Sequence, residues 1–293
     1  MRHAALATLA LLGFSACSGD TSSPTAATAD RALQAAMAAS AGPQRVIVTE
    51  SDITRQPENT PPTDNWVLYT RLAGNGAFVN GPGNPPLGTG SLTLTTPTGT
   101  DKVTLFNFDY AGTDLDLVRS MGYATFRTSG SGFQVAALNI QVDVNGAAPG
   151  GFTTLVFEPV YNTAQGTVTS GMWQTWDAYL GGNAIWWSSN PIPGAPNRDT
   201  FVSWKTILAN NPDAVIIGGY GVNQGSGNPG LITSVDGLHF DTPTVDVTYD
   251  FELFRVATAK DACKDDGWKT VRRADGTSFK NQGDCVSYTQ NGK

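Results

Sequence analysis

Short segments in which apolar and polar residues alternate recur along most of the chain and predict β-strands, because successive side chains of a strand point to opposite faces. Stretches rich in glycine and proline separate these segments and predict turns. The predicted strands lie at residues 91–95, 102–108, 123–128, 133–144, 152–160, 214–218, 234–240 and 245–256. Because strand follows strand without helices between them, we predict an all-β fold, an antiparallel two-sheet jelly-roll sandwich.

One segment has helical periodicity instead. Within residues 201–210, Phe201, Trp204 and Ile207 fall on one helical face. Thr200 is placed to cap this segment, and an Asn-Pro pair at 211–212 ends it. We therefore expect one short helix, closing an open end of the sandwich.

Four of the seven tryptophans lie within residues 170–189. Residues 173–179 and 184–188 are strand-like, and the glycines between them predict a hairpin. Trp173 and Trp176 then fall on opposite faces of their strand, as do the adjacent Trp186 and Trp187. We expect each pair to divide into one core ring and one outer ring. With Asp177 and Tyr179 beside them, the outer rings predict an aromatic platform for a sugar.

Composition sets the boundaries of the parts. The chain contains 33 glycines and 17 prolines, with charged residues at only 15%, which favours many short strands over long helices. Residues 17–62 are rich in Ser, Thr, Ala and Pro and predict a flexible, disordered tether, with residues 45–49 as a stray edge strand. The sandwich is then expected at 63–257 and a small module at 258–293.

The first 16 residues predict a secretory signal peptide, since a basic Arg2 precedes an apolar run at 4–14 that is too short to span a bilayer. Residues 14–17, Phe-Ser-Ala-Cys, resemble the lipobox of bacterial lipoproteins. The resemblance implies that Cys17 is lipidated and anchors the protein to a membrane. Ser18, where an inner-membrane lipoprotein would have Asp, favours the outer membrane or the cell surface.

The charge of the chain argues against nucleic acid as a partner. The formal net charge is −7 from 18 basic and 25 acidic residues, and removal of the signal peptide takes away one basic residue and leaves 17 − 25 = −8. A phosphate backbone repels such a chain, and its one basic pair is Arg272 and Arg273.

The cysteines predict one disulfide. If Cys17 carries lipid, Cys263 and Cys285 remain, and in an exported protein these two are expected to pair. Metal binding by the two thiols is the weaker alternative.

Several segments resemble a known kind of domain. Residues 138–146 (LNIQVDVNG), 152–162, 172–187 and 234–241 are similar to the concanavalin-like or laminin-G-like jelly-roll domain of exported bacterial proteins of unassigned function. Residues 263–290 resemble a short C-terminal module of secreted bacterial proteins, through Cys263, Gly267–Trp268 and the segment 279–285 (FKNQGDC). Neither resemblance implies a chemistry.

Candidate catalytic groups are sparse. Glycoside cleavage needs two carboxyl groups about 5–9.5 Å apart, and the closely spaced acids Asp114 with Asp116 and Asp246 with Asp250 fit no hydrolase motif. His239 is the one histidine after the signal peptide, and no serine lies in a GxSxG turn. A structural calcium ion is the cofactor that the loops favour, with Asp143, Asn145 and Asp236 as candidate ligands.

The sequence therefore favours a surface-tethered, non-catalytic domain that binds a glycan. The site would consist of Trp173, Trp176, Asp177, Tyr179, Trp186 and Trp187. Two alternatives stay open: a polysaccharide hydrolase or lyase, and a purely structural envelope or adhesion protein.

Overall fold

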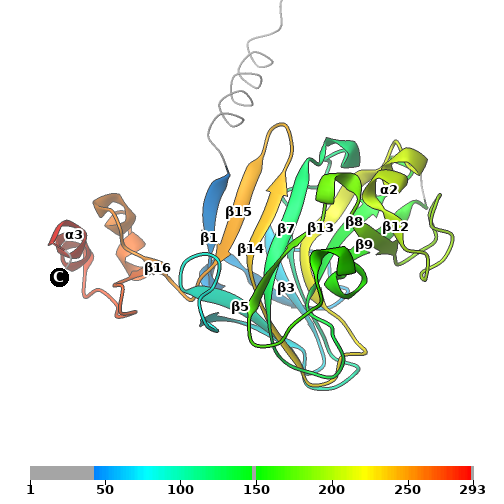
Figure 1. The fold of residues 1–293 in the computed structure, drawn as a ribbon. Helices are drawn as coiled ribbons and strands as arrows, with labels where there is room; N and C mark the ends of the chain where they lie inside the picture. Colours follow the sequence, from blue (N-terminus) through cyan, green and yellow to red (C-terminus); the bar gives the residue numbers. More distant parts are fainter. Residues whose placement is uncertain (1–42, 147–149, 292–293) are drawn as a thin grey trace, which may run out of the picture.

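The computed structural model describes residues 43–146 and 150–291. The predicted signal peptide and the lipidated Cys17 lie outside these residues. Two large β-sheets face each other and confirm the predicted all-β sandwich (Figure 1). Within the described residues, no helix is both long and apolar enough to cross a membrane.

Seven strands form the first sheet. They are β1 (Gln44–Val48), β4 (Asn75–Asn80), β5 (Gly90–Thr96), β7 (Ser120–Ser129), β10 (Trp173–Asp177), β14 (Leu231–Asp241) and β15 (Asp246–Phe251). The long strand β14 pairs with β7 on one side and with β5 and β15 on the other. The outer strands are β1, β4 and β10, so this sheet is organised around β14.

Eight strands form the second sheet. In spatial order they are β12 (Val202–Ser203), β11 (Ile185–Ser188), β9 (Phe152–Phe157), β8 (Ala137–Asp143), β13 (Val215–Gln224), β6 (Lys102–Asn107), β3 (Trp66–Arg71) and β2 (Thr54–Pro57). All pairs in the two sheets are antiparallel except β1 with β15 and β2 with β3.

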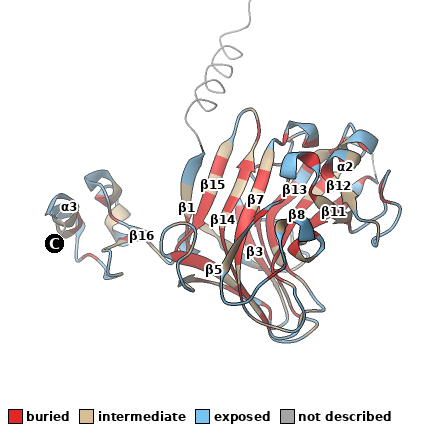
Figure 2. Ribbon diagram, in the orientation of Figure 1, coloured by how far each residue is buried: buried red, intermediate tan, exposed pale blue. Residues whose placement is uncertain are grey.

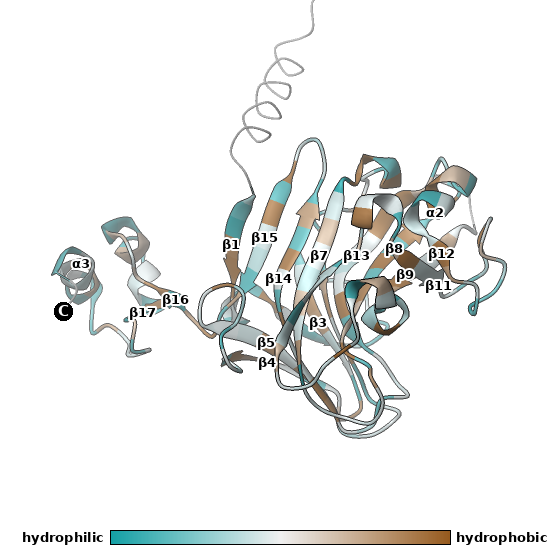
Figure 3. Ribbon diagram, viewed as in Figure 1, coloured by the Kyte–Doolittle hydropathy of each residue, from teal (hydrophilic) through white to brown (hydrophobic). Residues whose placement is uncertain are grey.

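The core lies between the sheets, where the alternation along each strand directs apolar side chains inward. Leu92 and Leu94 of β5 face Leu138 and Ile140 of β8 across one continuous cluster of buried residues. Figure 2 shows these buried positions on the strands of both sheets, and Figure 3 shows that they coincide with hydrophobic residues. Polar residues alternate with them on most strands, and Val67, Tyr69 and Phe106 form a second, smaller apolar cluster on β3 and β6.

The predicted helix is present as α2 (Trp204–Asn210), but it begins later than the sequence indicated. Residues 202–203 form strand β12, and the Ser203 hydroxyl accepts a hydrogen bond from the Thr206 amide. Ser203 rather than Thr200 is therefore the N-cap. Trp204 and Ile207 are buried against the core, which places α2 at one end of the sandwich.

The sandwich begins at Gln44 and not near residue 63 as predicted. The predicted edge strand at 45–49 is present as β1, and β2 is a second strand within the segment expected to be a tether. Each joins a different sheet, next to β15 and β3 respectively. Arg45 adds an ion pair with Asp250, with 2.6 Å between Nη2 and Oδ2. Residues 44–57 are thus part of the fold.

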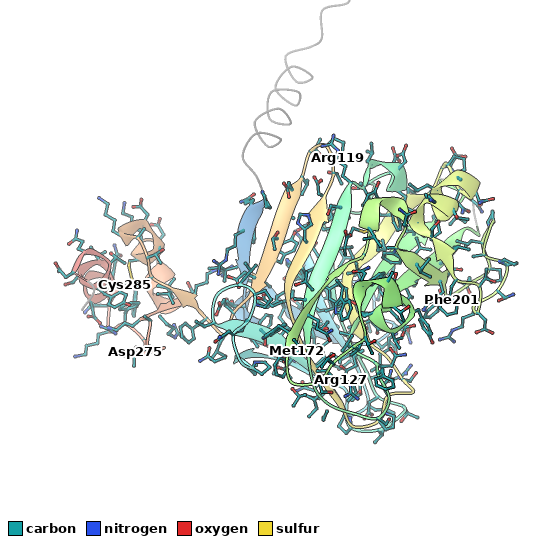
Figure 4. All side chains as sticks on the ribbon, viewed as in Figure 1. Arg119, Arg127, Met172, Phe201, Asp275 and Cys285 are labelled. Atoms are coloured by element: carbon teal, nitrogen blue, oxygen red, sulfur yellow. A yellow bond between two sulfur atoms is a disulfide. The ribbon has the colours of Figure 1, made fainter. Side chains whose placement is uncertain are left out.

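The C-terminal module stands beyond β16 (Arg255–Val256), away from the two sheets (Figure 1). It contains β17 (Val271–Arg272) and a helix that the sequence did not predict, α3 (Gln282–Asn291). The predicted disulfide between Cys263 and Cys285 is confirmed, and it closes a separation of 22 residues. Figure 4 labels Cys285 in this module. A small separate core of Val271, Phe279 and the disulfide holds it together.

Candidate functional site

The two strands rich in tryptophan do not form the predicted hairpin. β10 pairs with β7 in the seven-stranded sheet, whereas β11 pairs with β9 in the eight-stranded sheet. The intervening glycines, with Gly181 at φ 59°, turn the chain from one sheet to the other. The four indoles therefore belong to two different sheets.

As predicted, each pair of indoles divides into an inner and an outer ring. Trp176 and Trp186 are 1% and 0% exposed, and their Nε1 atoms donate to Thr125 Oγ1 at 2.8 Å and to the Ala178 carbonyl at 2.9 Å. Both inner rings are core residues without surface for a ligand, so the structure removes Trp176 and Trp186 from the predicted site.

The outer rings lie on opposite sides of the sandwich and form no common platform. Trp173, on the seven-stranded sheet, donates to the Pro82 carbonyl at 2.8 Å and packs edge-on against Phe126. Asp177 Oδ1 accepts from the Tyr179 and Leu180 amides, which is a turn-forming role. The Tyr179 ring packs against the core. Trp187, on the eight-stranded sheet, lines a hollow.

This hollow crosses the outer face of the eight-stranded sheet and has a volume of about 270 Å³. It spans six adjacent strands, from β11 to β3, at about 4.8 Å per strand. One outward side chain from each strand marks its course: Trp187, Val156, Asn139, Asn223, Lys102 and Arg71. Since inward residues such as Leu138 and Ile140 form the core, the alternation of β8 places Asn139 in the hollow.

Two neighbouring hollows extend it. One, of about 280 Å³, shares Glu158, Trp187 and Arg198 with it and adds the rings of Tyr161 and Phe201, which pack against each other at 46°. Figure 4 labels Phe201 on the side of the sandwich away from the C-terminal module. The other, of about 220 Å³, shares Lys102 and adds a cluster of three aromatic rings, those of Tyr69, Phe106 and Phe108. We call the three hollows together the groove.

Glu158 and Arg198 set the charge at the Trp187 end of the groove. The Trp187 Nε1 donates to Glu158 Oε2 at 2.8 Å, and the Arg198 Cζ lies 4.9 Å from the centre of the Trp187 ring. Burial raises the pKa of the Glu158 carboxyl, and the Trp187 N–H and the Arg198 charge oppose this rise only in part. Arg198 covers a face of the indole, so a sugar cannot stack there without displacing it.

At the far end of the groove, Glu58 holds two basic side chains. Its carboxylate oxygens lie 3.0 Å from Arg71 Nη1 and 2.6 Å from Lys102 Nζ. Two cations and one anion leave this end with a net positive charge.

The floor of the groove contains a polar atom without a partner. Asn139 is 7% exposed, and no described residue donates a hydrogen bond to its Oδ1. Gln134 Oε1, beside Tyr161 and Arg198, is likewise buried and unpartnered among the described residues. A buried acceptor left unpaired costs about 1–3 kcal/mol, so these two oxygens lower the stability of the folded chain.

The predicted calcium ligands do not come together. Asp143 ends β8 in the eight-stranded sheet and Asn145 follows it, and Asp143 Oδ1 accepts from the Asn145 amide at 2.8 Å. Asp236 lies on β14 in the other sheet. Among the described residues, no group of three His, Cys, Asp or Glu side chains is arranged to hold a metal ion.

Asp236 instead belongs to a group of three acids on the outer face of the seven-stranded sheet. Its oxygens accept from the Phe251 amide at 3.0 Å and the Leu87 amide at 2.9 Å. Glu252 accepts from the Thr89 amide at 2.7 Å, and Asp250 pairs with Arg45. Burial raises the pKa of Asp236 to about 7 and raises that of Asp250 as well. We call this group, with the segment 81–90 that supplies the Leu87 and Thr89 amides, the closed acid cluster.

Of the other chemically notable residues, His239 and Asp246 lie side by side, with 3.9 Å between Nδ1 and Oδ1. His239 Nδ1 lies 3.0 Å from the Val247 carbonyl, within the seven-stranded sheet. Asp114 precedes a short 3-10 turn, and Asp246 and Asp250 both lie on β15. None of them lines the groove.

Sequence reasoning missed Asn139, Glu158 and Arg198. Asn139 and Glu158 lie in or next to predicted strands, where a polar residue at an outward position is ordinary. Arg198 lies in an irregular segment without periodicity. The position of Asn139 between the apolar Leu138 and Ile140 could have identified it as an outward polar residue. It could not have shown which strands lie beside it.

Comparison with protein-family models, with curated proteins and with solved structures finds no match to this chain.

Proposed function

We propose that the protein binds a glycan in the groove, without cleaving it. The observation that carries the proposal is a hollow that crosses six strands on the outer face of one sheet, with the polar side chain of Asn139 in its lining. Sugar hydroxyls both donate to and accept from polar side chains, and a hollow of this length suits an extended polymer. Thr154 and Asn223 line the same hollow and add polar partners.

The carboxyl groups support binding over hydrolysis. Glu158 is the one carboxyl among the described residues that line the central hollow. Glu58 and Asp199 line the outer hollows, and Glu58 is engaged by Arg71 and Lys102. Cleavage through an acid and a base needs two free carboxyl groups on either side of one bond.

The test is an array of polysaccharides probed with the full chain and with the variants Asn139→Leu and Thr154→Ala. Loss of one or two hydrogen bonds should weaken binding about tenfold or more. Thr95→Ala is the matched control, because Thr95 lies on the outer face of the other sheet and bonds only the Asn75 carbonyl. Each variant is first shown to melt as the wild type does.

Three results would contradict the proposal. They are binding to no polysaccharide, equal loss in the Thr95 control, and shortened or unsaturated products after incubation with a bound glycan. The last result would favour the hydrolase or lyase alternative, and the first would favour the structural alternative.

We also propose that the protein is exported and held at the cell surface by lipid on Cys17, which supports binding of glycans outside the cell. Cys17→Ser should move the protein from the detergent phase to the aqueous phase on phase separation. An unchanged distribution would contradict the anchor and would leave the groove proposal untouched.

A further inference from the structure

We infer that the glycan is acidic, with carboxylate groups of uronic acids as the feature recognised, and that Arg198 binds one of them. This inference depends on the proposed function and adds the class of the ligand.

The first argument is the distribution of charge. The chain as a whole carries a formal net charge of −7, which repels polyanions in general. The central hollow reverses this sign, since it is lined by Arg71, Lys102 and Arg198 and by the single acid Glu158. Over the three hollows of the groove, three cations accompany Glu58, Glu158 and Asp199, and Arg71 and Lys102 are paired with Glu58. Complementarity for an acidic ligand therefore centres on Arg198, which forms no salt bridge with a described residue.

The second argument is the state of Arg198. Its guanidinium lies over the Trp187 ring, and it forms no salt bridge with any described residue. A cation–π contact holds the guanidinium near the indole without using its N–H donors, which remain available to a ligand. A guanidinium held in this way matches a planar carboxylate through two parallel hydrogen bonds.

The third argument is the separation of the positive charges. Arg198 lies at the Trp187 end of the hollow, next to β11, whereas Arg71 and Lys102 lie on β3 and β6. Four to five strand spacings separate these ends, which is roughly 20–24 Å. A single small acid cannot reach both ends. A polymer with a carboxylate on successive sugars can, and the neutral side chains Asn139, Thr154 and Asn223 between the ends suit its hydroxyl groups.

The experiment compares ligands that differ only in charge. Binding of the full chain to polygalacturonate is measured against the same polymer after complete methyl esterification, which removes the charge and keeps the hydroxyl groups. The inference predicts at least tenfold weaker binding to the ester. A sulfated polysaccharide of similar length tests whether a carboxylate is required or any anion suffices.

The variants test Arg198 itself. Arg198→Ala should weaken binding to the polyuronate about tenfold to a hundredfold. Arg198→Lys should recover only part of the loss, because lysine restores the charge but not the paired N–H donors of the guanidinium. Lys205→Ala is the control, since Lys205 is an exposed cation on α2 that does not line the groove. Melting curves of all variants exclude unfolding as the cause.

The outcomes separate the inference from the proposed function. Equal affinity for the acid and its ester, tighter binding of the sulfated polymer, or full affinity in Arg198→Ala would overturn the inference. Neutral glycans that bind and depend on Asn139 would at the same time uphold the proposed function. Binding of none of the polymers would overturn both.

Discussion

Asp236 in the closed acid cluster is buried and Glu158 in the groove is half-buried, and in both cases burial raises the carboxyl pKa. Their surroundings differ. Backbone amides from the segment 81–90 and from Phe251, together with Arg45, engage the acids of the closed cluster. In the groove, Asn139 Oδ1 and the Arg198 guanidinium have no such partners among the described residues.

The difference indicates that the two outer faces of the sandwich have different roles. On one face, backbone amides satisfy Asp236 and Glu252 and contribute to stability, although Asp250 Oδ1 has no hydrogen-bond partner among the described residues. The other leaves polar groups unsatisfied at some cost to stability, which is typical of a surface that meets a ligand. Variants on the two faces should therefore separate stability from binding.

The largest effect expected is the pH dependence that Asp236 imposes on stability. Its pKa rises from 3.8 to about 7 on folding, so the folded state binds the proton more tightly than the unfolded state. Stability is therefore fully present below about pH 4 and is lost as the pH rises to about 7, by up to about 4 kcal/mol for three pKa units. Urea denaturation at intervals between pH 4 and 8 measures this.

Asp236→Asn removes the titrating group and should flatten that dependence. It should also lower stability at acid pH by about 1–3 kcal/mol, because an amide NH₂ cannot accept from a backbone amide. Stability that rises between pH 5 and 8 in the wild type, or an unchanged slope in Asp236→Asn, would contradict the assignment.

The second effect concerns the counter-ion of the closed acid cluster. Arg45→Met should destabilise the fold by about 2 kcal/mol, because it leaves the fully buried Asp250 side chain without its cation. The value is below that for a wholly buried pair, since the Arg45 side chain is half exposed. Arg119→Met, at an exposed position, should change the free energy of unfolding by less than about 0.5 kcal/mol. Equal destabilisation by Arg45→Met and Arg119→Met would contradict a stabilising role for the Arg45–Asp250 ion pair.

The third effect concerns the acid of the groove. Glu158→Gln keeps an acceptor for the Trp187 Nε1 and removes only the titrating group, so its cost should stay below about 1 kcal/mol at neutral pH. Thermal melting at pH 7 measures it. A loss comparable to that of Arg45→Met would mean that Glu158 stabilises the fold and is not reserved for a ligand.

The smallest effect is expected at Asn139. Asn139→Leu replaces an unpaired buried acceptor by an apolar group of similar size and should leave stability equal or slightly higher, by up to about 1 kcal/mol. Denaturant titration of the unliganded chain checks this. A clear loss would show that Oδ1 has a partner in solution and would weaken the argument for a ligand.

Alternation along the chain predicted what each residue faces, but not which strands are neighbours. It predicted the sandwich and the division of Trp173 from Trp176 and of Trp186 from Trp187. The alternation wrongly predicted the hairpin, because glycines at 181–182 are equally compatible with a turn within one sheet and with a connection between two sheets.

Long-range pairing was also invisible to local patterns. β1 is five residues long and pairs with β15, some 200 positions further along the chain. Because local sequence gives no information about so distant a partner, its segment was predicted to be a tether. The groove depends on the same kind of information, since its six strands come from distant parts of the sequence. The disulfide could be predicted because it depends on residue type and count, not on strand order.

The parallel pairing of β1 with β15 has a mechanical consequence. The chain enters the sandwich at Gln44 and leaves it beyond Phe251, at opposite ends of the same strand pair. Tension between the two ends of the chain therefore acts along these strands in shear and loads the whole ladder at once. An antiparallel pair pulled from one end would open one bond at a time, so this edge is built to resist pulling.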